Sequence, residues 1–558
     1  MKKILQLFVV AVFGLAFATS CIEEIDPQDS RVTAEQAANA PGAYDNFVDA
    51  ITSTLVGRFT YSGNSTTTAY DYGYPSFFLM RDYSGHDHPV SGNNNWYSTW
   101  YSCGTALGPG YAACQYPWTY YYGWIKNCNT VLSLAGAEPD ADKVTGAGIA
   151  YAMRAMFYMD LARMFAQKTY ALDKQSETVP IIKETTALSD LAHNPRATNE
   201  EMWAFILSDL DKAEEYLAGY NRSNVYTPNL SVVYGLKARA YLVMEDWANA
   251  KKYAKQAQNG YSVMTKDQYT SRATGFNTPT PSWMFGVTFS PTDPNILLND
   301  GDSSWASWMC IEVNPTVSGC GYASNYGQPP IIDRHLYETI PATDFRKDCF
   351  VDFALDALPM ADCITALEAY SDYPSWVYQT GHDATYGAVG GLSLKFRLAG
   401  GQVGHDNQYI GFVVAVPLMR VEEMYLIEAE AAGMQSEADG IALLTAFAQT
   451  RDASYVYGTH TDAYGNTTTG TFRNEVWWQR RVELWGEGFA TFDIKRLNKG
   501  IIRSYANTNH QEPYRWNTVS PPDWMNLCIV QTEINYNYDC TNNPTPVRPA
   551  TESPEYPW

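Results

Sequence analysis

The chain has 558 residues, with 38 Lys and Arg against 60 Asp and Glu, which gives a formal net charge of −22 at pH 7. So acidic a chain repels phosphate backbones and contains no basic run, which excludes nucleic acid as a partner. Its 16 Trp and 41 Tyr exceed an ordinary share. Because flat rings with a polar edge stack on sugar faces and on peptides alike, they favour a binding function without naming the ligand.

The amino terminus has the pattern of a secretory signal. Two lysines precede an apolar run over residues 4–18, and small residues come just before Cys21. The run of about 15 residues is short for a transmembrane helix of ~20, so we expect residues 1–20 to be a signal peptide. Cys21 at the cleavage point resembles a bacterial lipobox, which predicts its lipidation and a tether over residues 21–32. The alternative is plain secretion, with Cys21 an ordinary residue.

Apolar residues at helical spacing predict a series of helices over residues 33–56, 118–134, 143–166, 198–218 and 236–257. Thr198 and Glu201 form a capping-box pattern at the start of the fourth helix. Ala250, Ala254 and Ala257, after a two-residue turn, resemble a tetratricopeptide helix pair, in which small side chains let two helices approach closely. We therefore expect a mostly α-helical fold.

Two long stretches lack this periodicity. Residues 57–117 are rich in Gly, Asn, Ser, Tyr and Trp, and residues 261–415 contain scattered strand-like runs at 392–397 and 410–416. Irregular stretches of this length in a compact protein are usually functional. We therefore expect the first stretch to have a functional role.

The cysteines after Cys21 fall as near neighbours in sequence, as Cys103/Cys114, Cys310/Cys320, Cys349/Cys363 and Cys528/Cys540, with Cys128 left over. In an exported protein, such spacing indicates local disulfides that pin long loops. The alternative is that these thiols are free and buried.

Helical patterns return over residues 417–431, 437–452 and 475–497. The last of these stretches combines charged and aromatic side chains at high density, which is costly to bury without partners. We therefore expect another part of the chain to pack tightly against it. Gly488 is predicted to end its helix, before the chain turns into residues 492–494.

Two motifs lie in this region. The pattern P-x-x-R-x-x-E-x-x-L-x-x-A-E is matched at Arg420, Glu423, Leu426, Ala429 and Glu430. The pattern R-x-E-L-x-x-E-G-x-R-x-x-D-x-x-R is matched at Arg481, Glu483, Leu484, Glu487, Gly488, Asp493 and Arg496. Both resemble signatures of the SusD/RagB family, surface lipoproteins of the Bacteroidetes. Ala490 departs from the second, because the family usually carries Arg or another basic residue there, and this change affects one local ion pair.

The resemblance implies a scaffold of about four tetratricopeptide-like helix pairs with a large irregular, partly β insertion domain. In this chain the helical repeats would cover residues 33–260, the irregular insertion region residues 261–415, and the C-terminal signature helices and tail residues 416–558. It further implies a lipoprotein anchored in outer-membrane lipid through Cys21 and facing the cell exterior. Such a protein binds oligosaccharides and delivers them to a SusC-like TonB-dependent transporter. Neither enzymatic activity nor a cofactor is implied.

In that family, ligand contacts come from loops inserted between the repeat helices, which correspond here to residues 57–117 and 270–330. The resemblance thus points to aromatic contacts from Trp96, Trp100, Tyr101, Trp283, Trp305 and Trp308. Polar contacts that orient hydroxyl groups are predicted for Arg81, Asp82 and Asn94. The alternative for each ring is packing inside its loop.

Three other functions stay open at this point. A relative of the same architecture could bind peptides or glycoprotein fragments, and a purely structural lid would bind nothing with its aromatic residues. A surface glycoside hydrolase would need a pair of carboxylates, and among 60 acids no pair stands out.

Known catalytic and metal-binding motifs are missing from the sequence. No nucleophile elbow, phosphate loop, His-Glu-x-x-His helix or dinucleotide glycine pattern occurs. His86, Asp87 and His88 could offer metal ligands, but no further ligand is identifiable and a solvated loop is favoured. Asp293, Asp300 and Asp302 lack the spacing of a calcium loop.

Overall fold

The computed structural model describes residues 40, 42–58, 70–92, 95–297, 303–316, 321–382, 385–464 and 469–558. The predicted signal peptide, the tether and Cys21 lie outside these ranges. The chain divides into two compact units, residues 1–47 and 48–558, and the larger unit contains every element below except the start of α3. Within the described ranges, no helix has both the length and the apolar character needed to cross a membrane.

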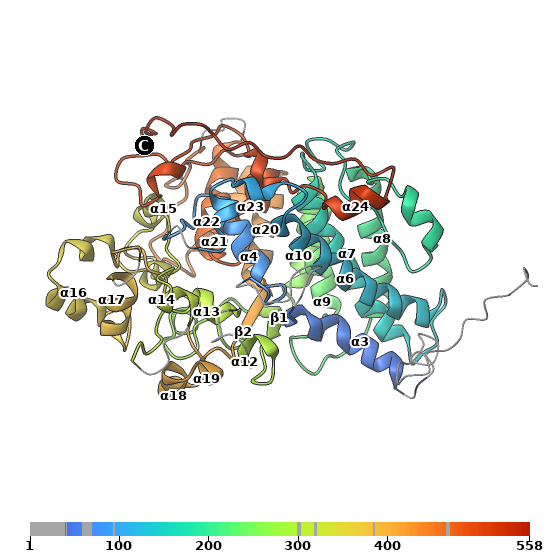
Figure 1. The fold of residues 1–558 in the computed structure, drawn as a ribbon, viewed down its shortest axis with the longest axis horizontal. Helices are drawn as coiled ribbons and strands as arrows, with labels where there is room; N and C mark the ends of the chain where they lie inside the picture. The colour runs from blue at the N-terminus through green and yellow to red at the C-terminus, as the bar shows by residue number, and fades with distance from the viewer. Residues whose placement is uncertain are drawn as a thin grey trace, which may run out of the picture. The chain divides into compact units, whose positions relative to one another are not determined.

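Helices dominate the fold, which confirms the expected mostly α-helical class (Figure 1). The longer ones are α3 (Ala43–Ser53), α6 (Ala112–Ala135), α7 (Val144–Phe165), α8 (Asn199–Tyr216), α9 (Leu230–Met244), α10 (Trp247–Ala257), α20 (Val421–Gly433), α21 (Glu437–Ala448) and α22 (Thr471–Glu483). Shorter helices are α4 (Ser76–Tyr83), α5 (Ser98–Tyr101), α11 (Lys266–Tyr269), α12 (Pro294–Leu297), α13 (Trp305–Met309), α14 (Tyr322–Asn325), α15 (Arg334–Thr339), α16 (Met360–Leu367), α17 (Pro374–His382), α18 (Gly401–Asp406), α19 (Gln408–Gly411), α23 (Ala490–Arg496) and α24 (Gln531–Tyr536).

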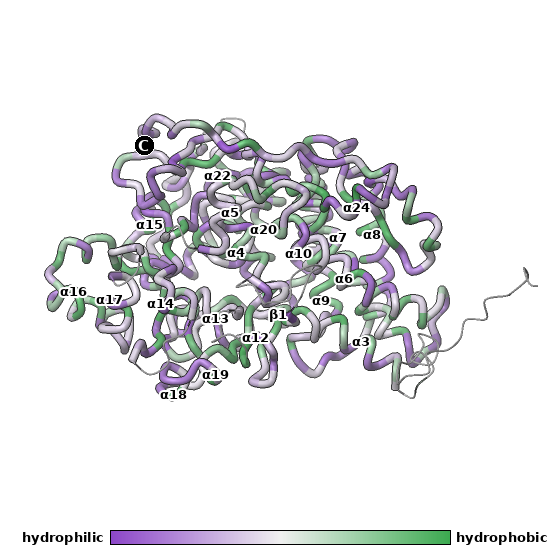
Figure 2. Tube along the Cα trace, viewed as in Figure 1, coloured by the Kyte–Doolittle hydropathy of each residue, from purple (hydrophilic) through white to green (hydrophobic). Residues whose placement is uncertain are grey.

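Consecutive long helices pack against each other in pairs. Helix α6 contacts α7, α7 contacts α8, α9 contacts α10, and α20 contacts α21. Helix α10 also packs against α20, so the C-terminal helices continue the stack that the N-terminal ones begin (Figure 1). Hydrophobic and hydrophilic residues are mixed along the chain (Figure 2), and helices α7, α9 and α20 bury most of their residues.

Local sequence signals explain the helix boundaries. Thr198 and Glu201 form the predicted capping box at the start of α8. The turn between α9 and α10 has Glu245 in the left-handed conformation and Asp246 capping α10. Helices α9 and α10 pack against each other as predicted, and Ala250, Ala254 and Ala257 of α10 are fully buried.

The sheet has two antiparallel strands, β1 (Trp283–Thr288) and β2 (Ala415–Arg420), with Val287 paired to Val416. The strand predicted at 392–397 does not form. Within that run, Leu392 and Ser393 make only isolated β-bridges. Pro417, predicted to start a helix, lies in β2 instead. Proline is tolerated at the edge of a sheet, where no ladder hydrogen bond requires its missing N–H.

The final charged stretch also differs from its prediction. Helix α22 ends at Glu483 rather than near Gly488, and residues 492–494 belong to α23. Gly486 and Gly488 lie between the two helices with φ of +75° and +79°. A Cβ at Gly488 would lie 2.7 Å from Phe78 Cα, so the turn needs glycine.

Tight packing against the charged stretch is confirmed. Arg420 is buried and pairs with Glu483 at 3.0 Å and with Glu487 at 2.8 Å. Arg451 contacts Glu483 at 2.9 Å, and Arg496 of α23 contacts Glu430 of α20 at 2.6 Å. The motif residues therefore form a buried ionic network that joins β2 and α20 to the segment from α22 to α23.

The structure forms none of the predicted local disulfides whose two cysteines are both described. Cys103, Cys114, Cys349, Cys363, Cys528 and Cys540 all carry free, buried thiols. Cys310 is likewise free, and its predicted partner Cys320 lies outside the described residues. Cysteines that are close in sequence are therefore not bonded to each other here. Cys114 interacts with the thiol of Cys528 instead of its predicted partner Cys103.

Candidate ligand-binding surface

The structure buries most of the aromatic side chains predicted to contact a ligand. Trp100, Tyr101, Trp283, Trp305 and Trp308 are each at most 1% exposed. In this conformation their rings pack in the interior, and a role in ligand contact stays a prediction for them.

Trp96 differs from the other predicted rings because its side chain is 48% exposed. The predicted polar contact Asn94, two residues before Trp96, lies outside the described residues.

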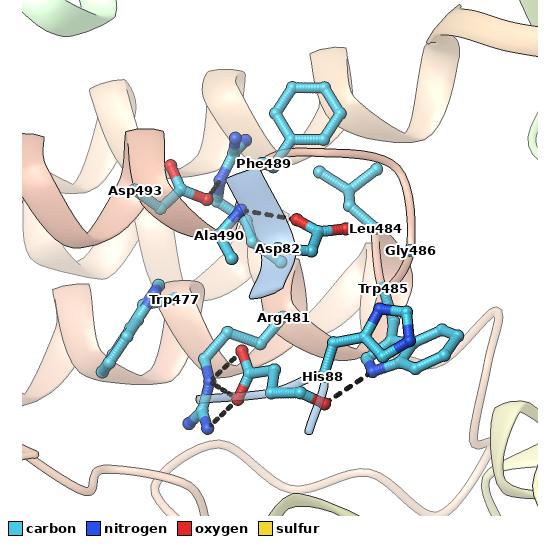
Figure 3. Close-up of a pocket in the computed structure, with 12 residues that line it drawn as sticks. Asp82, His88, Trp477, Arg481, Leu484, Trp485, Gly486, Phe489, Ala490 and Asp493 are labelled. Carbon is cyan, nitrogen blue, oxygen red and sulfur yellow. Dashed lines mark hydrogen bonds and ion pairs between the residues drawn. The ribbon is translucent and has the colours of Figure 1, made fainter. Parts of the chain in front are cut away.

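Arg81 and Asp82 join α4 to α23 and α7. The Arg81 guanidinium lies 3.3 Å from Asp160 and over the Phe492 ring. The Asp82 carboxylate accepts hydrogen bonds from the backbone N–H of Gly488 at 3.0 Å and from that of Ala490 at 3.3 Å, the second of which is drawn in Figure 3. Both side chains are thus engaged inside the protein, and their role in ligand contact likewise stays a prediction.

Burial and backbone groups set the environment of this carboxylate. At position 490, where the family pattern has a basic residue, this chain has alanine, whose backbone N–H donates to Asp82. Burial raises the pKa of Asp82 to about 7, because the surrounding protein disfavours the charged form.

The His86–His88 loop is a structural contact rather than a solvated loop. Asp87 pairs with Arg481, and the Trp485 indole donates a hydrogen bond to the Asp87 carbonyl at 2.8 Å (Figure 3). Burial lowers the pKa of His86 well below its ordinary value and that of His88 to about 3. Among the described residues, no group of three His, Cys, Asp or Glu could hold a metal ion.

The cavity beside this loop is too small for a sugar. It lies between residues 82–88 and the turn from α22 to α23 (Figure 3), and its volume is about 20 Å³. That is room for about one water molecule. The cavity therefore belongs to the packing around Asp82.

A row of aromatic rings, which we call the aromatic row, connects the two loop regions. It consists of Trp96, Tyr70, Tyr97, Trp308, Tyr322 and Tyr326. Successive ring centroids lie 6.0, 6.0, 4.9, 3.9 and 5.0 Å apart. The inner four rings are buried, whereas Trp96 is 48% and Tyr326 50% exposed. The two exposed end rings are therefore supported by rigidly packed ones.

Sequence reasoning missed Tyr326. It lies in the second predicted loop region, directly after the short helix α14, but the tryptophans of that region drew the prediction instead. Composition could not separate them, because buried and exposed rings have the same sequence signal.

Two polar groups accompany the aromatic row. Ser91 Oγ and Gln328 Oε1 are buried without a hydrogen-bond partner in the described part of the chain. Their segments touch, since a Cβ at Gly92 would lie 2.7 Å from Gln328 Nε2. Buried polar groups normally have a partner, so water or a ligand hydroxyl group is the expected one here.

Two family models match the chain. Residues 68–242 match a family described as "Starch-binding associating with outer membrane", and residues 388–545 match the SusD family. The fold and these matches define the chain as a SusD-like helical protein. It belongs to the SusD/RagB family. None of the curated proteins matches it.

Solved structures of SusD-like proteins share the fold. A SusD-like carbohydrate binding protein from Bacteroides vulgatus ATCC 8482 is 20% identical, with a TM-score of 0.67 over 89% of this chain and 97% of that one. A SusD superfamily protein from Bacteroides thetaiotaomicron VPI-5482 is 18% identical, with a TM-score of 0.61 over 90% and 99%. Surface glycan-binding protein A from B. thetaiotaomicron, solved in complex with laminarihexaose, is 16% identical, with a TM-score of 0.62 over 89% and 97%.

Proposed function

We propose that this protein is a cell-surface lipoprotein that binds oligosaccharides or polysaccharide fragments and delivers them to a SusC-like TonB-dependent outer-membrane transporter. Family membership and the laminarihexaose complex of one relative support the ligand class. The observation that carries the proposal for this chain is the pair of half-exposed rings, Trp96 and Tyr326, at the ends of the aromatic row.

The aromatic row suits a sugar ligand physically. The exposed faces of Trp96 and Tyr326 offer apolar area to the C–H faces of sugar rings. The buried rings behind them restrict both side chains, so little conformational freedom is lost on binding. The family's binding role requires neither catalysis nor a cofactor.

The other predicted contacts fit this proposal in different ways. Trp308 supports the row from within, and Asn94 lies two residues before Trp96 in sequence. Trp100, Tyr101, Trp283, Trp305, Arg81 and Asp82 are engaged in the interior, so direct contact with a ligand would require them to move.

Anchoring and delivery rest on the sequence and on the family. Lipidation of Cys21 would attach the body to outer-membrane lipid, and the acidic tether over residues 21–32 would hold it at the surface. The transporter partner follows from the family resemblance. Pull-down of a transporter from outer membranes with the lipidated protein, and its loss with Cys21→Ala, would test both statements.

Ligand binding is tested with a soluble form that begins at Ile22. We expect it to bind one class of polysaccharide in a glycan array. Trp96→Ala and Tyr326→Ala should each weaken that binding on the order of tenfold, because each removes one stacking face.

Tyr536→Ala is the matched control, since Tyr536 is a well-exposed ring on α24 outside the row. Binding of peptides but no glycan by the folded protein would contradict the sugar proposal. Shortened products after incubation with the bound polysaccharide would instead establish a hydrolase.

A further inference from the structure

The C-terminal segment after α23 returns to the N-terminal helices. The Gln531 N–H donates to the Pro109 carbonyl at 2.9 Å, and the Leu527 N–H donates to the Met164 carbonyl at 3.0 Å. The Asn543 amide donates to the Phe165 carbonyl at 2.7 Å. These bonds hold residues 527–543 against the start of α6 and the end of α7.

Two buried thiols meet at this contact. Cys114 lies in the first turn of α6 and donates to the Leu107 carbonyl at 3.1 Å. Cys528 lies 3.7 Å from the Asn543 and Pro544 carbonyl oxygens. Both residues are fully buried. The bond from Gln531 to Pro109 holds the segment of Cys528 against the same loop, residues 107–109, whose Leu107 carbonyl accepts from Cys114, and the two thiols interact there.

No comparable contact joins other cysteines in the described ranges. Cys103, Cys128, Cys310, Cys349, Cys363 and Cys540 interact there with carbonyl groups, charged groups or apolar neighbours. Cys114 and Cys528 are therefore the two described thiols best placed for a covalent bond.

We propose that Cys114 and Cys528 form a disulfide in the exported protein, joining α6 to the C-terminal segment across roughly 400 residues of chain. This inference needs export to an oxidising compartment and does not depend on which ligand the aromatic row binds.

The oxidant is a disulfide, R–S–S–R, carried by a small molecule or an oxidoreductase. One cysteine thiolate attacks it, which forms a mixed disulfide and releases one R–SH. The second cysteine thiolate attacks the mixed disulfide, which forms the Cys114–Cys528 bond and releases the second R–SH. One S–S bond forms as one breaks, the two electrons pass to the oxidant, and both thiol protons end on R–SH.

Burial sets the order of events. Since neither sulfur is exposed in the folded chain, the exchange takes place while the C-terminal segment docks, before the site closes. Once formed, the bond is shielded from external reductants. The bond also closes a long loop. In the chain-entropy model, a cross-link restricts the unfolded chain more when the loop it closes is longer.

The bond is tested on the full chain exported to an oxidising compartment. Free thiols are blocked with N-ethylmaleimide under denaturing conditions, and the digested protein is mapped by mass spectrometry. We expect a linked peptide pair containing Cys114 and Cys528, with mass lower by about two units than the sum of its reduced peptides. Cys103 and Cys540 should carry the blocking group.

Substitutions separate this pairing from the local ones. Cys103→Ser and Cys540→Ser should leave the linked pair intact, and Cys114→Ser should abolish it. The melting temperature of the wild-type chain should fall after denaturation and refolding in reductant, and the Cys114→Ser/Cys528→Ser protein should show no such fall. Blocking of both Cys114 and Cys528 in the exported wild-type chain would overturn the proposal, as would a link from Cys114 to Cys103.

Discussion

Arg481 of α22 and Asp87 of the loop after α4 form a bidentate ion pair, with Arg481 Nε 2.9 Å from Oδ2 and Nη2 2.5 Å from Oδ1. The guanidinium also lies over the rings of Tyr464 and Trp477. Arg481 is a position of the family signature, so this signature residue holds the N-terminal loop against the C-terminal helices.

Replacing Arg481 by alanine should be strongly destabilising. The change leaves the Asp87 carboxylate buried without its cation, which costs about 3–5 kcal/mol of unfolding free energy. Denaturant unfolding measures the loss.

Arg272→Ala is the control, because Arg272 pairs with Asp372 where both side chains are exposed. Such a pair contributes about 0–1 kcal/mol. Equal losses in the two variants would contradict a structural role for the Arg481–Asp87 pair.

Asp82 should make stability depend on pH. Its pKa is raised by burial from 3.8 to about 7, so the folded chain retains a proton that the unfolded chain releases. The contribution of this proton to the free energy of unfolding is complete below about pH 4. It is lost as the pH rises to about 7, and the loss is on the order of a few kcal/mol.

Asp82→Asn tests this dependence, because asparagine imitates the protonated acid. The unfolding free energy of the wild type minus that of Asp82→Asn should fall between about pH 4 and pH 7 and then level off. A difference that stays constant over this range would show that Asp82 does not titrate there.

Gly488 should not tolerate a side chain. Its φ is +79°, and an added Cβ would meet the Phe78 backbone of α4. Gly488→Ala should therefore cost more than the ~1 kcal/mol expected for a left-handed glycine with free space around it.

Gly219→Ala provides that comparison, because Gly219 has φ of +78° and no atom within 4 Å of an added Cβ. Thermal or denaturant unfolding of both variants gives the difference. Similar losses would mean that the contact with Phe78 adjusts easily.

Inner and end rings of the aromatic row should respond differently to truncation. Trp308→Ala removes a fully buried ring and should cost about 3–5 kcal/mol. Trp96→Ala removes a half-exposed ring and should change stability by about 1 kcal/mol or less while weakening glycan binding.

Unfolding and binding are measured on the same samples. If Trp96→Ala lowers stability as much as Trp308→Ala and leaves glycan binding intact, the exposed ring serves packing alone.

The sequence by itself determined the helical scaffold, the capping box at Thr198, the close helix contact at Ala250 and the family. These features depend on periodicity and on neighbouring residues, which a single sequence displays directly. The charge density of residues 475–497 also showed correctly that another part of the chain must pack there.

Only the tertiary structure decided which aromatic side chains are exposed and which cysteines meet. Trp96 and Trp100 look alike in sequence, yet one ring is half exposed and the other buried. Cys114 interacts with Cys528 instead of Cys103, and Asp82 faces the backbone of Ala490. Such contacts join segments hundreds of residues apart, and their position depends on how the whole chain packs rather than on local propensity.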